Sequence, residues 1–304
     1  MNKRLSKLNQ LIKNANLDAV ALIPGPSFVY LTGLHFHVSE RPTVFLYAQD
    51  TESPVLILPE LEIAKADFCE YKLATFAYND NPTTWQQAFS KAADYLKLGS
   101  SSIGVEPAHF RVLELRFLEK AIPDAKFVSA ETALAQLRMH KDSQEIDYMI
   151  KANRIAEAGL RETLKSVKVG MDEREIASEL TIQILRAGSD VLAYIPIVAS
   201  GPNSANPHAM PTNRKINYGD ILLFDYGAVF NGYCSDITRT FAIGDLDPEV
   251  KVIYDTVLKA NTAARQFAKP GIKAGEVDNA AREVIKNAGY GQYFIHRTGH
   301  GLGM

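Results

Sequence analysis

An internal repeat in the second half of the chain constrains the possible folds more than any other feature. The segment VKVGMDEREIASELTIQILRAG at 167–188 aligns without a gap on AKPGIKAGEVDNAAREVIKNAG at 268–289, at an offset of 101 residues. Glycines recur at matching places around each amphipathic stretch, as a turn and a C-terminal helix cap require. The identical pairs are Lys168/Lys269, Gly170/Gly271, Glu175/Glu276, Ile184/Ile285, Ala187/Ala288 and Gly188/Gly289, and Ile176/Val277 is conservative. The repeat predicts a duplicated unit with two equivalent helices.

The two copies differ in the segments that come after them. After Gly188 come the strand-like segments YIPIVAS, DILLFDYGAVF and GYCSDITRTFAI, which we expect to form the sheet that supports the helices. Only fifteen residues come after Gly289, and they end in HRTGHGLGM. We therefore expect the second copy to lack most of its strands, so that the second domain is incomplete at its C-terminus.

The first part of the chain has a different pattern. Short apolar runs alternate with amphipathic stretches, which predicts an α/β domain over residues 1–134. Its predicted strands are DAVALIP, TVFLYAQ, PVLILPE and SSIGVEP, and its predicted helices are the N-terminal segment, PTTWQQAFSKAADYLKL and HFRVLELRFLEKAI. An α+β domain over residues 135–304 follows, and a long helix near its start should be capped by Ser143. The expected inner stripe of that helix contains Ile146, Met149, Ile150 and Ile155.

Composition and charge exclude several classes of function. With 46% hydrophobic and 22% charged residues and a formal net charge of −2, the chain has no field that would gather nucleic acid or an anionic membrane. No stretch approaches the roughly 20 apolar residues needed to span a bilayer, and the start of the chain lacks the apolar core of a signal peptide. Cys69 and Cys234 are too few for a disulfide framework, so a cytoplasmic protein is expected.

A β-hairpin is predicted around Asn231-Gly232, in the segment ILLFDYGAVFNGYCSDITRTFAI. A type I′ turn needs positive φ at both central positions, and Asn-Gly provides it. In that register Phe230 faces Tyr233 and Thr238 faces Asp225. One face then carries a set of large apolar side chains and is expected to be the core face: Leu222, Phe224, Tyr226, Phe230, Tyr233, Ile237 and Phe241.

The opposite face of the hairpin brings Asp225 and Asp236 within reach of each other across the strands. Two like charges in a largely apolar sheet are costly unless they are protonated, paired or bound to cations. Carboxylates on a rigid scaffold suit magnesium, manganese or zinc, and Gly227 beside them leaves space near the backbone. The alternative is that this face points to water and that the aspartates serve solubility alone.

Two of the seven histidines stand in places that suit a functional site. His208 follows a strand and a loop rich in Gly, Pro, Asn and Ser, where side chains often project into a site. His300 is framed by Gly299 and Gly301 and can be approached closely on both sides. Four others are expected to be surface or core residues, although the polar loop with His37 could reach a neighbouring subunit: His35, His37, His109 and His140.

Three segments together resemble one family. VASGPNSANPH, LLFDYGAVFNGYCSDITRTFAIG and GYGQYFIHRTGHGLGM are similar to motifs of the pita-bread metallopeptidases, and most of all of the bacterial Xaa-Pro dipeptidases, or prolidases. The likeness extends to YLTGLHFHVSERP and ILPELEIAKA, so it covers nearly the whole chain. The resemblance implies a creatinase-like N-terminal domain and a pita-bread C-terminal domain with internal pseudo-twofold symmetry. It also implies hydrolysis of proline-containing dipeptides, and we expect a homodimer.

The resemblance implies roles for five residues. Asp225 would bind one of two divalent metal ions, Asp236 would bridge both, and His300 would bind the other. His208 and His296 would be the catalytic histidines that steady the peptide and the developing tetrahedral charge. The ions, manganese first and otherwise cobalt or zinc, would hold a hydroxide at neutral pH and polarise the scissile carbonyl.

The resemblance also places two glutamate ligands and a substrate-binding arginine of the family beyond the last residue of this sequence. The 304-residue chain is therefore expected to bind metal weakly and to be weakly active or inactive. Three alternatives remain open at this point. They are an aminopeptidase P-type enzyme acting on longer peptides, a non-catalytic binding module with the same fold, and a metal-free C–N hydrolase of the creatinase type.

Overall fold

The computed structural model describes residues 2–304, which form two compact units. The N-terminal unit contains the residues up to Lys141 together with Met304, and the C-terminal unit contains Asp142–Gly303. The expected domain boundary between residues 134 and 135 remains a prediction. None of the helices within residues 2–304 combines the length and the apolar character needed to cross a membrane.

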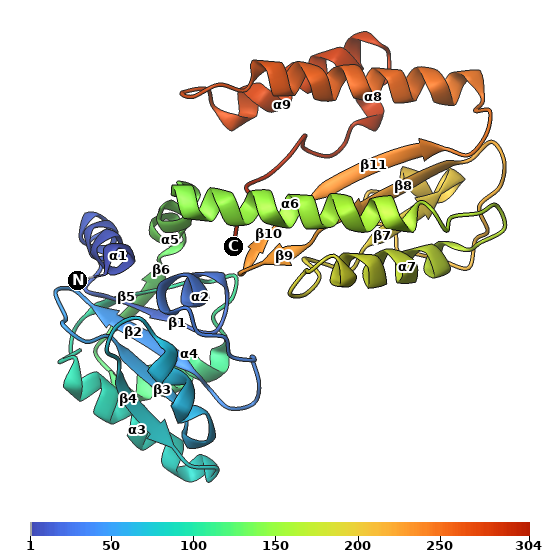
Figure 1. The fold of residues 1–304 in the computed structure, drawn as a ribbon. Helices are drawn as coiled ribbons and strands as arrows, with labels where there is room; N and C mark the ends of the chain where they lie inside the picture. The colour runs from blue at the N-terminus through green and yellow to red at the C-terminus, as the bar shows by residue number, and fades with distance from the viewer. Residues whose placement is uncertain (1) are drawn as a thin grey trace. The chain divides into compact units, whose positions relative to one another are not determined.

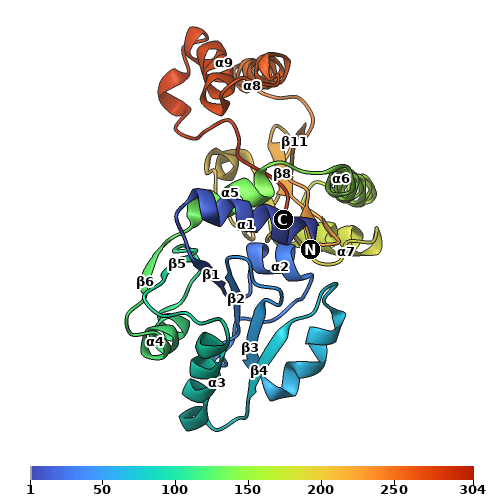
Figure 2. The same cartoon turned by 90° about the vertical axis from the view of Figure 1, so that its left-hand side faces the viewer.

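The N-terminal unit is built on a six-stranded sheet with helices on both faces (Figures 1 and 2). The strand order is β4-β3-β2-β1-β5-β6, and β2 runs antiparallel to both of its neighbours while the other pairs are parallel. The strands are β1 (Ala19–Leu22), β2 (Val44–Ala48), β3 (Val55–Pro59), β4 (Ala74–Tyr78), β5 (Ser102–Val105) and β6 (Lys126–Ser129). All four strands predicted here are present, because a strand buried on both faces needs a continuous apolar run.

Each face of this sheet supports its own hydrophobic core. The first core packs α1 (Lys3–Asn14), α2 (Pro26–Thr32) and α5 (Glu131–Met139) on side chains such as Phe45 and Leu56. The second packs α3 (Pro82–Tyr95) and α4 (Val112–Ala121) on the alternate side chains of the same strands. A 3₁₀ segment, η1 (Glu60–Phe68), follows β3. This is the α/β layering that the sequence predicts.

The C-terminal unit begins with the packed helices α6 (Ser143–Thr163) and α7 (Glu173–Arg186). The prediction that Ser143 caps α6 was wrong. Asp142 is the cap, since its carboxylate accepts a hydrogen bond from Glu145 N at 2.9 Å while the Glu145 carboxylate accepts one from Asp142 N at 2.8 Å. This reciprocal capping box satisfies two backbone donors that a serine alone would not.

The expected inner stripe of α6 was also partly wrong. Ile146 and Ile150 are 48% and 43% exposed, whereas Ile155 is buried. Small residues instead form much of the buried face, because α6 approaches α7 closely. A Cβ added at Gly159 would lie 2.9 Å from the backbone nitrogen of Ile184 on α7, so this crossing needs glycine.

The sheet of the C-terminal unit carries the predicted hairpin. Its antiparallel strands, in the order β11-β8-β7, are β7 (Ile197–Ser200), β8 (Ile221–Tyr226) and β11 (Ile237–Ala242), and the hairpin ends in β9 (Val229–Phe230) and β10 (Tyr233–Cys234). The predicted core face is confirmed, since Tyr233 is buried and the other six side chains lie in or against one hydrophobic cluster with α6 and α7. The hairpin's other face is therefore the one that can carry polar groups.

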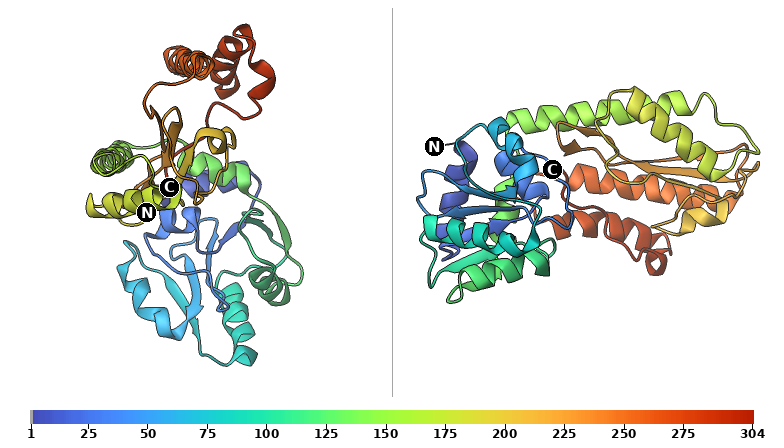
Figure 3. Two further views of the ribbon diagram at one scale, coloured as in Figure 1. Left: turned by 90° about the vertical axis from the view of Figure 1, so that its right-hand side faces the viewer. Right: turned by 90° about the horizontal axis from the view of Figure 1, so that it is seen from below.

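A second helix pair, α8 (Pro248–Phe267) and α9 (Ala274–Asn287), follows β11. Figures 1 and 3 show α6–α7 and α8–α9 on different sides of the three-stranded sheet. Helices α7 and α9 each have 14 residues, and they begin and end 101 residues apart, as the repeat predicts. Gly188 and Gly289, just past the two helices, have φ of 102° and 87°, so the predicted C-terminal glycine turns are confirmed.

Candidate functional site

The hairpin turn sets the register that places the two aspartates. Asn231 and Gly232 have φ of 48° and 80°, as a type I′ turn requires, and Phe230 pairs with Tyr233. Farther along the strands Thr238 pairs with Asp225, so the predicted register is confirmed. Because side chains alternate along a strand, Asp225 and Asp236 lie on the face opposite the apolar core.

Tyr194, in the segment between α7 and β7, joins the two carboxylates. Its hydroxyl lies 2.6 Å from Asp225 Oδ1 and 3.1 Å from Asp236 Oδ1, so the phenol is shared between them. The predicted convergence of the two aspartates is thus present in the structure. The sequence prediction did not include Tyr194, because nothing in its local pattern shows that it points at residues 31 and 42 positions away.

Burial and like charge shape the protonation of this cluster. Burial raises the pKa of Asp225, the hydrogen bond from Tyr194 opposes that rise, and the neighbouring Asp236 charge adds to it. Burial, together with its hydrogen bonds and its proximity to both aspartates, raises the pKa of Tyr194, so the phenol remains a donor. The site therefore carries excess negative charge in a partly desolvated environment, and a bound cation would stabilise it.

His300 lies beside this carboxylate pair. Its Nε2 is 3.1 Å from Asp236 Oδ2 and its Nδ1 is 2.9 Å from the carbonyl oxygen of Gly301. A carbonyl oxygen only accepts, so Nδ1 donates, and a neutral ring then presents the lone pair of Nε2 to a carboxylate. Two acceptors facing each other need a proton or a cation between them. The contact with Asp236 brings together two of the three side chains expected to hold metal.

His208 and His296 form a second pair. Their ring centroids are 5.9 Å apart with an interplanar angle of 87°, an edge-to-face contact. Nδ1 of His296 lies 2.9 Å from the carbonyl oxygen of Arg297, so Nε2 is left free to accept a hydrogen bond. Both side chains are exposed. The other histidines named above, at 35, 37, 109 and 140, belong to the N-terminal unit.

A pocket of about 570 Å³ borders these groups. Its lining includes Asp225, Asp236, Thr238, His296 and His300. Thus both aspartates, the histidine beside them and one member of the histidine pair open on one cavity, of the size that small ligands occupy.

The donor set can be tested against a divalent cation. Within residues 2–304 no three His, Cys, Asp or Glu side chains are arranged to hold a metal ion. In the contacts present, the Tyr194 hydroxyl lies between Asp225 and Asp236, and Nε2 of His300 faces Asp236. Carboxylate oxygens and a neutral imidazole nitrogen are nevertheless the donors that manganese and zinc take, so the residue types fit such an ion.

A buried carboxylate holds the loop that carries His208. Glu173, at the start of α7, is 0% exposed and accepts hydrogen bonds from Ser200, Asn203 and Thr212. Burial alone acts to raise its pKa, but the hydrogen bonds from Thr212 and Ser200 outweigh that effect, so the pKa of Glu173 lies below its ordinary value. The sequence prediction missed this residue, although a glutamate at the first helical position is a recognisable signal.

Glu173 should make the stability of the protein depend on pH. Its folded-state pKa is lowered, so its stabilising effect is present above the unfolded value of 4.5 and is lost as pH falls through the folded value. We expect Glu173→Gln to lower the free energy of unfolding by about 3 kcal/mol at pH 7. The NH₂ group of the glutamine would face the N–H and O–H donors that now bond to a carboxylate oxygen, so hydrogen bonds would be lost. The deficit should shrink below pH 4.5 in urea titrations followed by circular dichroism.

The control for this measurement is Glu175→Gln, an exposed position in the same helix turn that accepts only from Asp172 N among the hydrogen bonds described. It should cost about 1 kcal/mol or less. A deficit of Glu173→Gln that stays constant between pH 7 and pH 3 would contradict the assignment of Glu173 as an ionised, buried acceptor.

Known proteins resemble the chain over nearly its whole length. The description "Metallopeptidase family M24" matches residues 147–304, and "Creatinase/Prolidase N-terminal domain" matches residues 4–140. A putative dipeptidase of Bacillus subtilis is 33% identical over 301 residues, which span 99% of this chain and 82% of that protein. The Xaa-Pro dipeptidase of Pyrococcus horikoshii is 32% identical over 310 residues, which span 100% of this chain and 82% of that protein.

Solved structures agree with these matches. A dipeptidase from Pyrococcus horikoshii has a TM-score of 0.91 at 38% identity, covering 99% of this chain and 82% of that one. An X-Pro aminopeptidase from Thermotoga maritima has a TM-score of 0.84 at 30% identity, covering 100% of this chain and 82% of that one. The expected creatinase-like and pita-bread domains are confirmed by these similarities. The chain therefore belongs to metallopeptidase family M24 and carries a creatinase/prolidase-type N-terminal domain.

Proposed function

We propose that this chain is a metal-dependent hydrolase of Xaa-Pro dipeptides, with Asp225, Asp236 and His300 as metal ligands and His208 and His296 as catalytic histidines. One observation carries the proposal: the paired carboxylates, His300 and His296 border one pocket, and His208 meets His296 edge to face. Relatives called Xaa-Pro dipeptidase, from Lactobacillus helveticus and Pyrococcus horikoshii, support the choice of substrate.

Each residue has a defined task in this proposal. Asp225, Asp236 and Nε2 of His300 supply the protein donors for two divalent ions, with manganese the first choice and cobalt or zinc the alternatives. Such ions, when bound, supply the positive charge that activates water and polarises the scissile carbonyl. His296 holds its Nδ1 on the Arg297 carbonyl and keeps Nε2 for the substrate, and His208 beside it can donate to the charge that develops on the carbonyl oxygen.

The bond before proline explains why such an enzyme needs a dedicated site. It is a tertiary amide without an N–H group, and the ring fixes φ of proline, so general peptidases handle it poorly. An enzyme for longer Xaa-Pro peptides is the second candidate, and it is favoured by the similarity to the X-Pro aminopeptidase of Thermotoga maritima. The two differ in whether a tripeptide or longer substrate is cleaved.

A cytoplasmic location and a homodimeric state are part of the same proposal. Burial raises the pKa of both thiols, Cys69 and Cys234, so each is held in its unreactive protonated form. Two such cysteines fit a reducing compartment. Sedimentation analysis of the purified chain tests the dimer directly.

The decisive experiment titrates manganese into the purified chain of 304 residues while hydrolysis of Met-Pro is measured. The described residues offer three protein donors at the site, so we expect weak metal binding and a kcat below roughly 1 s⁻¹, the lower end of ordinary enzymes. Met-Pro-Ala in parallel separates the dipeptidase from the enzyme for longer peptides. A chain that binds manganese but cleaves neither substrate would leave a binding module as the better description.

A further inference from the structure

The loop that carries His208 is fastened at both ends by one carboxylate. Glu173 Oε1 accepts from Ser200 N at 2.7 Å and from Ser200 Oγ at 2.8 Å. Its Oε2 accepts from Thr212 N at 2.9 Å and from Thr212 Oγ1 at 2.6 Å. The amide of Asn203, inside the loop, lies 3.1 Å from both oxygens. His208 stands between these attachment points, at the end of a stretch, residues 205–208, in which every residue is exposed.

A different carboxylate holds the segment that carries His296. Asp278, on α9, accepts from Thr298 N at 2.7 Å through Oδ1 and from Arg282 Nε at 3.1 Å through Oδ2. The same guanidinium donates to the carbonyl oxygens of Phe294 at 2.8 Å and His296 at 3.0 Å, and it lies 4.5 Å from the Phe294 ring centroid. The backbone on both sides of His296 is therefore tied to one helix.

The two anchors lie on the two repeated helices but at different positions. At the repeat offset of 101, Glu173 corresponds to Ala274 and Asp278 corresponds to Ala177. Each histidine segment is thus attached to one of the two repeated helices, and each helix uses its own acidic residue for the attachment. By contrast, Glu175 and Glu276 do correspond, and both accept from the backbone at the start of their helix.

We propose that Glu173 and Asp278 are positioning residues that set the arrangement of His208 and His296. The expected effect on catalysis rests on the proposed function, whereas the positioning of the two histidines does not. Both rings are exposed and touch edge to face at 5.9 Å, so their mutual placement depends on how the two segments are held. A shift of about 1 Å in such a group can lower a rate about 100-fold.

The test compares Glu173→Gln and Asp278→Asn with the matched controls Glu175→Gln and Glu276→Gln. In the metal-free chain labelled at histidine Cε1, assigned through His208→Gln and His296→Gln, we expect the His208 resonance to move in Glu173→Gln and the His296 resonance to move in Asp278→Asn. The controls should leave both resonances in place. If the proposed dipeptide is cleaved, kcat should fall about 10- to 100-fold in the two anchor variants, with KM changed less than kcat.

A second pair of variants covers the case in which Glu173→Gln does not fold. Thr212→Val removes one hydroxyl donor to Glu173 and should move the His208 resonance. Thr212→Ser keeps the hydroxyl, so the His208 resonance should stay in place. Unmoved His208 and His296 resonances in folded anchor variants would overturn the proposal. The amount of Met-Pro hydrolysis by the unmodified chain bears on the proposed function alone, because the resonance measurement needs no turnover.

Discussion

Replacing Asp236 by Asn should abolish the proposed metal-dependent hydrolysis. Asp236 contacts both Tyr194 and His300, so its carboxylate is the group that connects the aspartate pair with the histidine. Asn keeps the shape but removes the charge that balances a divalent cation. We expect manganese affinity, measured by calorimetry, to fall on the order of 100-fold or more. Hydrolysis should fall at least about 1,000-fold, since charge stabilisation by the cation is worth several kcal/mol.

A measurement of unfolding distinguishes this loss of metal binding from misfolding of the variant. The charge of Asp236 raises the pKa of its neighbour Asp225, which means that the two carboxylates repel each other in the metal-free protein. Asp236→Asn removes that repulsion, so its unfolding midpoint without metal should equal or exceed that of the unmodified chain. The midpoint of the unmodified chain alone should then rise when manganese is added.

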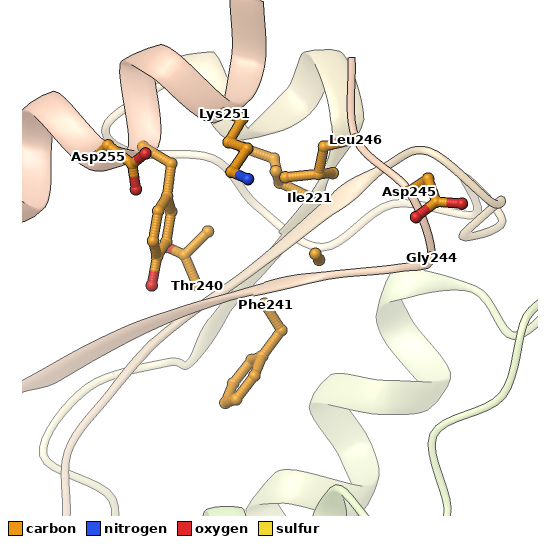
Figure 4. A pocket seen from close by; sticks show the side chains of 10 residues that line it. Ile221, Thr240, Phe241, Gly244, Asp245, Leu246, Lys251 and Asp255 are labelled. Atoms are coloured by element: carbon orange, nitrogen blue, oxygen red, sulfur yellow. The ribbon is translucent and has the colours of Figure 1, made fainter. Parts of the chain in front are cut away.

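An acidic pocket elsewhere in the same unit provides the control. It has a volume of about 570 Å³ and is lined by Asp245, Asp255 and Lys251 among others (Figure 4). Its lining includes no histidine, and its lysine offsets part of the acidic charge. Asp245→Asn and Asp255→Asn should leave manganese affinity unchanged. If they weaken it as much as Asp236→Asn does, the binding reflects general acidity and the ligand assignment is wrong.

Replacing Gly227 by Ala should destabilise the C-terminal unit by about 3 kcal/mol or more. A Cβ at this position would lie 2.1 Å from the carbonyl oxygen of Ser235 and 2.8 Å from the Ala193 Cβ. The Ser235 carbonyl belongs to the backbone, so it cannot move away from the new Cβ as easily as the end of a flexible side chain would. The backbone would have to move at a point of the hairpin between Asp225 and Asp236. The movement would also reach Tyr194, which follows Ala193 in the chain. Urea unfolding measures the loss of stability, and calorimetry with manganese measures the loss of the site.

Gly275→Ala is the matched control for this change. Gly275 lies in α9, and a Cβ added there would meet no atom within 4 Å. Alanine is the better helix former, so this substitution should raise the free energy of unfolding by up to about 1 kcal/mol. If Gly227→Ala were as stable as Gly275→Ala, the hairpin would have more room beside the aspartates than the structure shows.

The hairpin and the repeated helices could be predicted because their signals are local. Asn231-Gly232 selects one turn type, the turn sets the register, and the register decides which side chains share a face. Likewise the glycine after α7 and the glycine after α9 mark where each helix stops, and both bounds follow the repeat. The inner stripe of α6 was predicted only in part, since apolar spacing does not reveal that Gly159 allows a close crossing with α7.

The sequence by itself determined which residue types are available and which strand face carries the acidic pair Asp225 and Asp236. Only the tertiary structure decided what those residues contact. The phenol of Tyr194 between the aspartates, and the carboxylates of Glu173 and Asp278 behind the histidine segments, join positions from 20 to 42 residues apart. Periodicity reports the environment of a helix or strand, whereas a hydrogen bond between distant side chains depends on where whole elements pack.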